Sequence, residues 1–299
     1  MGIEKSEIKM TIGIIANISK SDILLIVKKI IEQIHQNGFN YILSESLLGF
    51  KKELNGESNY LSHDKLSKSC DMVVSIGGDG TMLNTAYEVR HSSTPIIGVN
   101  FGKLGFLAEF DLAGFTDFLQ DIKTKNYVVE ERMTLSGECC SKELFAINDL
   151  VIDKGSWSKM IELTIKVDED YVATFSADGL IVATPTGSTG YSLSTGGPIV
   201  NPKADVITLS PIAPHTLTMR PLVISSQQKV MVIVNSPSEK IQVSCDGQRV
   251  EYFDSPSVII IEKSKQPVRL VHSNRTNYFE ILRNKLFWGL DVRKSNNTN

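Results

Sequence analysis

The chain has 299 residues, a length typical of two domains, and a formal net charge of −3 at pH 7. Hydrophobic residues make up 41% and charged residues 22%, which is the composition of a globular protein with a sizeable core. The near-neutral charge excludes a basic surface that would attract nucleic acid or anionic lipid, so a phosphate-rich ligand must be held locally.

The four cysteines are Cys70, Cys139, Cys140 and Cys245, and none stands in a Cys-x-x-Cys pair. This spacing excludes a disulfide framework and a zinc site, and it is typical of a reducing compartment. No run reaches the ~18 apolar residues of a membrane span, and the first residues lack the apolar run of a secretory signal. We therefore expect a cytoplasmic protein with no membrane or nucleic-acid partner.

Strands and helices alternate in the first third of the chain. Strands are predicted at 10–16, 41–43, 71–76 and 95–100, and helices at 22–36, 81–90 and 111–123. Residues 49–69 are polar, and we expect mostly loop with some helix there. Because apolar strands alternating with helices indicate a parallel sheet covered on both faces, we predict an α/β domain with a Rossmann-like parallel sheet.

The chain after about residue 130 is rich in short strands instead. Apolar and polar residues alternate from Ile161 to Val167, the pattern of a half-exposed strand. Further strands are predicted at 145–152, 180–183, 230–234, 241–244, 258–261 and 268–272, separated by turn formers such as Asn235-Ser236-Pro237 and Asp246-Gly247. We therefore predict an α/β domain at 1–130 and an all-β antiparallel sandwich at 131–279, with a tail at 280–299 that could pack back on the first domain.

The segment Gly77-Gly78-Asp79-Gly80-Thr81 is the strongest local signal of chemistry. It joins a predicted strand to a predicted helix, which is the edge of an α/β sheet where ligands bind. Glycine lets a ligand approach the backbone, and the amides of a helix N-terminus favour phosphate oxygens. A carboxylate there can accept a proton from a hydroxyl or hold a divalent metal. The alternative is that Asp79 only caps the helix, although three surrounding glycines exceed what a cap needs.

A second signal is the run from Thr184 to Pro198, which is dense in hydroxyls and glycines and follows an apolar strand. Such a segment can wrap a phosphate or a ribose. The alternative is a flexible loop between strands, but the absence of Lys, Glu and Gln favours a shaped binding loop. The sequence contains no Gly-x-x-x-x-Gly-Lys-Ser/Thr loop and no Gly-x-Gly-x-x-Gly after a strand, which excludes a P-loop triphosphatase and weakens a redox Rossmann interpretation.

Two weaker features accompany these segments. Asn148-Asp149 interrupts the apolar strand predicted at 145–152, where its side chains could fork onto ribose hydroxyls, although Asn and Asp are also routine at bulges. Asp178-Gly179 precedes the strand that leads into the glycine-rich segment, and taken alone it predicts a hairpin turn.

Taken together, these segments resemble the NAD kinase family from about Met10 to Asp291, nearly the whole chain. The Gly77 to Thr81 motif alone is shared with diacylglycerol and sphingoid lipid kinases, and nearly so with phosphofructokinases, whereas the Thr184 to Pro198 segment is far more specific. The further matches are Asn100 to Leu107, the Asn148-Asp149 pair, Asp178-Gly179 and Asp246-Gly247-Gln248.

The resemblance implies an ATP-dependent kinase that transfers the terminal phosphoryl group of ATP to the 2′-hydroxyl of the adenosine ribose of NAD, giving NADP. It implies that Asp79 accepts the hydroxyl proton, that a divalent cation (Mg²⁺) is required, and that the chain forms a homodimer or homotetramer. The residues that match substrate or nucleotide contacts are Gly77, Gly78, Gly80, Thr81, Asn84, Asn148, Asp149, Lys159, Ser176, Asp178, Thr189, Gly190, Tyr191, Ser192, Leu193, Ser194 and Gln248. Asp149 stands where the family commonly has Glu, and Gly190 where Ala is frequent; the resemblance does not identify the metal ligands.

Two alternatives remain open at this point. A lipid kinase with the same glycine motif would need an apolar or basic surface for membrane docking, and nothing from Thr184 to Pro198 suggests a site for a lipid tail. A non-catalytic NAD(P)-sensing module would keep the dinucleotide loop but could lose Asp79, which is present.

Overall fold

The computed structural model describes residues 10–54, 59–100, 105–275 and 277–289. By its internal contacts the chain divides into two compact units, Met1–Glu130 with Arg269–Asn299, and Glu131–Val268. We call them the α/β unit and the β unit. The chain leaves the α/β unit after Glu130 and returns to it at Arg269. The cause is the last strand, which belongs to the sheet of the α/β unit.

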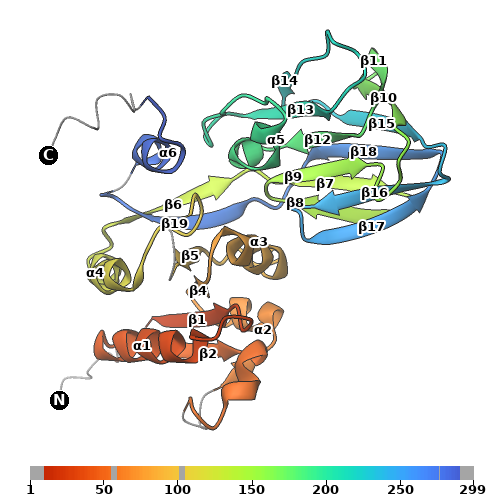
Figure 1. Ribbon diagram of the computed structural model, residues 1–299. Helices are drawn as coiled ribbons and strands as arrows, with labels where there is room; N and C mark the ends of the chain where they lie inside the picture. Colours follow the sequence, from red (N-terminus) through yellow and green to blue (C-terminus); the bar gives the residue numbers. More distant parts are fainter. Residues whose placement is uncertain (1–9, 55–58, 101–104, 276, 290–299) are drawn as a thin grey trace, which may run out of the picture. The chain divides into compact units, whose positions relative to one another are not determined.

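The α/β unit contains a seven-stranded sheet with the order β3-β2-β1-β4-β5-β19-β6 (Figure 1). The strands are β1 (Thr11–Ala16), β2 (Asn40–Ser44), β3 (Tyr60–Leu61), β4 (Met72–Ile76), β5 (Ile96–Val99), β6 (Tyr127–Arg132) and β19 (Val268–Ser273). From β3 to β19, neighbouring strands pair in parallel. The predicted parallel sheet is confirmed, whereas β3 lies within the segment predicted as loop and helix.

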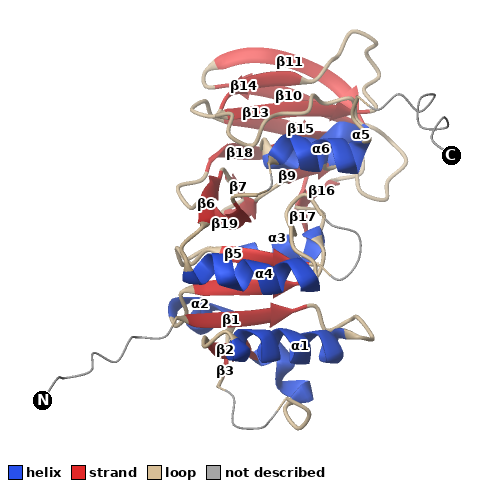
Figure 2. Cartoon of the chain, turned by 90° about the vertical axis from the view of Figure 1, so that its left-hand side faces the viewer, coloured by secondary structure: helices blue, strands red, loops and turns tan. Residues whose placement is uncertain are grey.

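Helices cover both faces of this sheet. They are α1 (Ile23–Gln36), α2 (His63–Lys68), α3 (Asp79–Glu88) and α4 (Leu112–Lys123). A further helix of the unit, α6 (Tyr278–Leu286), lies near the end of the chain. One face of the central strands, with Ile14 and Val74, shares a core with α1 and α4. On the other face Gly13 lies against Leu66 of α2, and the Ser75 hydroxyl hydrogen-bonds Thr85 of α3 at 2.8 Å. Figure 2 shows the same division of the helices.

The strand order creates a topological switch point in the α/β unit. From β1 the chain continues to β2 on one side, whereas from β4 it continues to β5 on the other, and β1 and β4 are neighbours. Connections diverge there, and in open α/β sheets ligands bind beyond the carboxyl ends of the strands at such a point, here the ends of β1 and β4. The residues that follow these two strands are Asn17 and Gly77.

The β unit consists of two six-stranded sheets, with the orders β11-β10-β15-β18-β7-β8 and β14-β13-β12-β9-β16-β17. The first contains β7 (Leu135–Cys139), β8 (Lys142–Ala146), β10 (Ile161–Val167), β11 (Asp170–Ala177), β15 (Val230–Asn235) and β18 (Ser257–Lys263). The second contains β9 (Asp149–Asp153), β12 (Gly179–Ala183), β13 (Val206–Ile212), β14 (Leu222–Ser225), β16 (Lys240–Cys245) and β17 (Arg249–Asp254). Inward residues of both sheets, such as Leu163 and Val182, form one core, which confirms the antiparallel sandwich.

Two sequence predictions about the β unit were wrong in the same way. The strand predicted at 145–152 is two strands, since β8 ends in one sheet and β9 begins in the other. Asp178-Gly179 is not a hairpin turn, because β11 and β12 also lie in different sheets. Both crossings carry polar residues, Asn148-Asp149 and Asp178, but a short polar interruption of an apolar run does not distinguish a crossing between two sheets from a bulge or a turn. The turn predicted at Asp246-Gly247 is confirmed, since it joins the paired strands β16 and β17.

None of the described helices combines the length and the apolar composition that crossing a bilayer requires.

Candidate active site

The glycine motif forms a tight connection between β4 and α3. Gly77 has a φ of 157°, and a Cβ placed there would lie 2.2 Å from the Thr81 hydroxyl oxygen, so only glycine fits. Gly78 is the N-cap of α3, and Asp79 is its first residue. The alternative that Asp79 merely caps the helix is therefore wrong, and its carboxylate is available for another purpose.

The Asp79 carboxylate is held by three successive backbone amides. The amide of Phe106 donates to Oδ2 at 2.8 Å, and those of Leu107 and Ala108 donate to Oδ1 at 3.0 and 3.1 Å. A carboxylate offers about four lone-pair positions, so Oδ2 keeps capacity for another donor. The backbone thus fixes the orientation of the acid while one of its oxygens can still accept a proton.

The amides of Phe106 and Leu107 belong to the segment whose resemblance was noted at Asn100 to Leu107, and that of Ala108 follows directly; residues 101–104 lie outside the described part of the chain. No pattern in the sequence predicts that this segment contacts Asp79. Gly105 makes the contact possible, because a Cβ placed there would lie 1.8 Å from Asp79 Oδ1. From the sequence alone, Gly105 could not be recognised as a residue of the site, because its role follows from the contact with Asp79.

Asn17 joins the same junction from β1. Its side-chain nitrogen lies 3.4 Å from the Thr81 hydroxyl, and its backbone amide donates to the carbonyl of Ile76 at 3.1 Å. Asn17 was not predicted from the sequence, because its proximity follows from the strand order. Asn84 is exposed on α3 one turn after Gly80, so these two predicted contacts share one face of the helix.

In the β unit, Asn148 and Asp149 lie where the chain crosses from β8 to β9. The crossing is packed against the start of the glycine-rich segment: the amide of Thr184 donates to the carbonyl of Asn148 at 2.8 Å, and its hydroxyl donates to the carbonyl of Ile147 at 2.6 Å. A Cβ at Gly187 would lie 2.1 Å from the Asn148 carbonyl oxygen. The two sequence signals of this half therefore meet in space.

The side chains of Asn148 and Asp149 lie beside Gly190. A Cβ at Gly190 would be 3.6 Å from Asp149 Oδ2 and 3.7 Å from Asn148 Nδ2. Asn148 Oδ1 is buried and has no hydrogen-bond partner among the described residues. Asp149 is only 5% exposed; burial first, and the charge of Asp246 second, raise its pKa to about 7.

The segment from Thr184 to Pro198 is ordered and contains a 3₁₀ helix (Thr186–Thr189) followed by the short helix α5 (Tyr191–Ser194). Some of its hydroxyls are used internally: the amide of Val200 donates to Ser188 Oγ at 3.0 Å, and Ser192 Oγ hydrogen-bonds Ser210 Oγ at 2.9 Å. Of the predicted contact residues, Ser192 is buried, Thr189, Gly190 and Leu193 are half-buried, and Tyr191 and Ser194 are exposed.

The remaining predicted residues are distributed over the β unit. Lys159 is exposed between β9 and β10, Ser176 is exposed on β11, and Gln248 is exposed at the turn between β16 and β17. Asp178 lies between β11 and β12, where its Oδ1 is 2.6 Å from Lys154 Nζ. Lys154, which offsets the charge of Asp178, was not predicted from the sequence.

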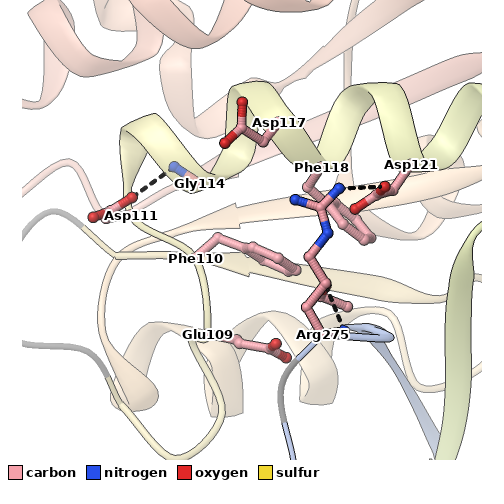
Figure 3. A pocket seen from close by; sticks show the side chains of 9 residues that line it. Glu109, Phe110, Asp111, Gly114, Asp117, Phe118, Asp121 and Arg275 are labelled. Atoms are coloured by element: carbon pink, nitrogen blue, oxygen red, sulfur yellow. Dashed lines mark hydrogen bonds and ion pairs between the residues drawn. The ribbon is translucent and has the colours of Figure 1, made fainter.

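A pocket of about 230 Å³ lies in the α/β unit between α4 and the residues that follow β19 (Figure 3). It is lined by Glu109, Phe110, Asp111, Gly114, Asp117, Phe118, Asp121, Ser273 and Arg275, none of which was predicted for the site. Two of its acids have structural roles, since Asp111 accepts the Gly114 amide at 2.7 Å at the start of α4 and Asp121 pairs with Arg275 at 2.9 Å.

Comparisons with known proteins agree with these two halves. The family model of the ATP-NAD kinase N-terminal domain matches residues 12–127, and that of the ATP-NAD kinase C-terminal domain matches residues 147–273. The NAD kinase of Prosthecochloris aestuarii is 38% identical over 285 residues, covering 94% of this chain and 98% of that protein. The NAD kinase of Flavobacterium psychrophilum is 35% identical over 294 residues, covering 95% of this chain and 100% of that protein.

Two solved structures are similar in fold. An NAD kinase from Archaeoglobus fulgidus in complex with ATP is 30% identical, with a TM-score of 0.75, and the match covers 93% of this chain and 99% of that one. Yeast NADH kinase complexed with NADH is 22% identical, with a TM-score of 0.85, and the match covers 95% of this chain and 89% of that one.

Proposed function

The chain belongs to the ATP-NAD kinase family and phosphorylates NAD with ATP as the donor, and we propose that Asp79 is the general base of this reaction. The supporting observation is the anchoring of its carboxylate by the amides of Phe106, Leu107 and Ala108, with capacity left on Oδ2. An acid fixed in this way needs no reorganisation when a hydroxyl approaches it, which is the property that a catalytic base requires.

In the proposed reaction, Asp79 accepts the proton of the adenosine ribose 2′-hydroxyl as the ribose oxygen attacks the terminal phosphorus of ATP. The new bond joins the ribose oxygen to that phosphorus, and the bond from the phosphorus to the bridging oxygen breaks, releasing ADP. Base assistance of this kind raises the reaction rate roughly 10²–10⁴-fold. Positioning and charge neutralisation supply most of the remainder in phosphoryl transfer.

The phosphates would lie against the glycine connection before α3. The sequence has no P-loop lysine, so we assign phosphate binding to the backbone of Gly77, Gly78, Gly80 and Thr81 at the positive end of this helix. Within the described residues, no group of three or more His, Cys, Asp or Glu side chains could hold a metal ion. A required Mg²⁺ would therefore be held mainly by the phosphates of ATP and by water, a mode that suits its reluctance to lose water.

We assign NAD binding to the residues around the crossing from β8 to β9. Asn148 Oδ1, for which the described part of the chain supplies no partner, needs a hydrogen-bond donor, and Asp149 beside it offers acceptors to ribose hydroxyls. The other residues to which we assign contacts with NAD are Asn84, Lys159, Ser176, Asp178, Thr189, Gly190, Tyr191, Ser192, Leu193, Ser194 and Gln248. Ser192 would act through its backbone, since its hydroxyl already pairs with Ser210.

We further propose a homodimer or homotetramer in the cytoplasm. Leu217 is 90% exposed in the connection before β14, and Leu222 and Val223 on β14 are exposed as well. An exposed apolar group of this kind is typical of a subunit contact. All four cysteines are free, as a reducing compartment requires. A monomeric mass in light scattering would contradict the proposed assembly.

The test of the mechanism is the variant Asp79→Asn, which keeps the size of the side chain but cannot accept the proton. Purified protein is mixed with NAD, ATP and Mg²⁺, and NADP is measured with a dehydrogenase that accepts only NADP. We expect kcat to fall roughly 10²–10⁴-fold while NAD binding in calorimetry persists. The control is Glu88→Gln at the other end of α3, where the acid is 39% exposed and 3.5 Å from His63. Near-normal turnover of Asp79→Asn would remove Asp79 from the mechanism.

A further inference from the structure

Asp246 occupies the turn between β16 and β17 in a way that the turn itself does not explain. Its φ of 54° and the φ of 66° at Gly247 are left-handed, and Asp and Gly are the usual residues of such turns. Turn residues normally direct their side chains to solvent, yet the Asp246 side chain is 0% exposed. It turns inward, toward the crossing from β8 to β9.

The buried carboxylate binds three successive amides with a single oxygen. Asp246 Oδ1 accepts from the amides of Ile147 at 2.9 Å, Asn148 at 2.7 Å and Asp149 at 3.3 Å. The Asp246 amide in turn donates to the carbonyl of Asp149 at 2.9 Å. The other carboxylate oxygen, Oδ2, accepts from Arg249 Nη2 at 2.7 Å, so the buried charge is paired.

Residues 147 and 148 lie outside any strand, between the end of β8 and the start of β9, so no strand pairing fixes their backbone. The Asp246 carboxylate supplies the bonds that a sheet would otherwise provide. We propose that Asp246 is a positioning residue for the kinase reaction, which holds Asn148 and Asp149 in the orientation that binds NAD. This inference rests on the NAD-binding role proposed above for these two residues.

The charge of Asp246 adds a second influence on the site. It is a cause, after burial, of the raised pKa of Asp149, while Arg249 on the far side offsets part of the negative charge. In Asp246→Asn the side chain keeps its size and an acceptor oxygen, but the charge is lost and an amide group faces the guanidinium of Arg249. The bonds to the three amides then weaken, and the pKa of Asp149 falls because the neighbouring negative charge is gone.

The experiment compares steady-state kinetics of Asp246→Asn and the control Asp254→Asn between pH 5.5 and 8.5. Asp254 is in the same hairpin, at the end of β17, and its side chain is 88% exposed. We expect the KM for NAD of Asp246→Asn to rise about tenfold, with the KM for ATP unchanged. In the unmodified chain, kcat/KM for NAD should rise with pH as Asp149 ionises. In Asp246→Asn this rise should occur at lower pH. The control should match the unmodified chain.

Asp149→Asn and the double variant separate the possible failures. If Asp149→Asn leaves the KM for NAD unchanged, the proposed binding role of Asp149 fails. If Asp149→Asn raises the KM but Asp246→Asn changes neither the KM for NAD nor the pH profile, only the positioning role fails. An equal fall in kcat/KM for NAD and for ATP, together with a lower Tm, would show that Asp246 is merely structural. In the double variant the effects should be less than additive, since both act on one contact.

A second variant keeps the proposal testable if Asp246→Asn does not fold. Arg249→Lys keeps the positive charge but loses the planar guanidinium that meets Asp246 Oδ2. We expect a smaller rise in the KM for NAD, about threefold, and an unchanged pH profile. An unchanged KM for NAD in a folded Arg249→Lys variant would overturn the positioning role.

Discussion

The proposed role of Asp79 depends on the space beside its carboxylate. Gly105 leaves room for the carboxylate, since a Cβ there would lie 1.8 Å from Asp79 Oδ1, and its φ is not in the left-handed region. Gly105→Ala should therefore fold but push the carboxylate away from the amides of Phe106 to Ala108. A displacement of about 1 Å at a catalytic group costs roughly 10²-fold in rate, so we expect a fall in kcat of that size.

The measurement for this variant is the NADP assay with saturating ATP and NAD, together with a thermal melt. Gly49→Ala is the control, because a Cβ at Gly49 would meet no atom within 4 Å. An alanine at 105 with unchanged kcat would mean that the observed contact of Asp79 is not part of the active arrangement.

Asp149 should make the stability of the chain depend on pH. Burial raises its pKa to about 7 from an ordinary value of 3.8, so the folded state keeps a proton that the unfolded state releases between these values. The free energy of unfolding therefore falls as pH rises from about 4 to about 7. Asp149→Asn, which cannot ionise, should stabilise the ligand-free protein by about 1–3 kcal/mol more at pH 8 than at pH 5.

Chemical denaturation of both proteins at the two pH values measures this difference. A constant difference between pH 5 and pH 8 would show that Asp149 has no raised pKa. The pair Asn148-Asp149 could be recognised in the sequence as polar groups in an apolar run. Its burial beside the distant turn that carries Asp246 could not, because that contact is a property of the fold.

At the scale of elements, the sequence determines where strands and helices lie better than which sheet they join. The apolar spacing predicted a helix at 22–36, and α1 spans Ile23–Gln36. Alternation predicted a strand at 161–167, and β10 spans Ile161–Val167. Both patterns reflect one buried face, which local periodicity reports directly. The crossing at Asn148 and the short β3 depend on partners distant in sequence, and periodicity contains no information about them.

The candidate site follows the same division. The glycine motif and the Thr184 to Pro198 segment were predictable because close backbone approach and dense hydroxyls are local properties. The contacts from Asn17, from the amides of Phe106 to Ala108 and from Asp246 were not, because each joins segments brought together by sheet order or by a turn. The sequence thus indicates the groups to which we assign ligand contacts, whereas the groups that orient them emerge from topology.

At the scale of the whole molecule, the two units differ in how the chain builds them. The β unit is one continuous segment, and both of its sheets use only strands from β7 to β18. The α/β unit needs the end of the chain, because β19 lies between β5 and β6 in its sheet. The sequence pattern of 268–272 predicted a strand correctly. The same pattern does not show which sheet a strand joins, so the return of this strand to the first sheet could not be predicted.

This difference predicts distinct behaviour of fragments. Residues 131–268 should fold alone, with a cooperative thermal transition and the circular dichroism of a β protein, because their core is complete. A chain ending at Pro267 should have a disordered or strongly destabilised α/β unit. It lacks the buried Leu270 and Val271, and it leaves Glu109, 8% exposed, without His272 at 2.7 Å.

A chain ending at Gly289 retains β19 and α6, so it is the matched control and should keep both transitions. Calorimetric scans of the three proteins measure the outcome, and a normal α/β transition in the chain ending at Pro267 would show that β19 is dispensable to its sheet.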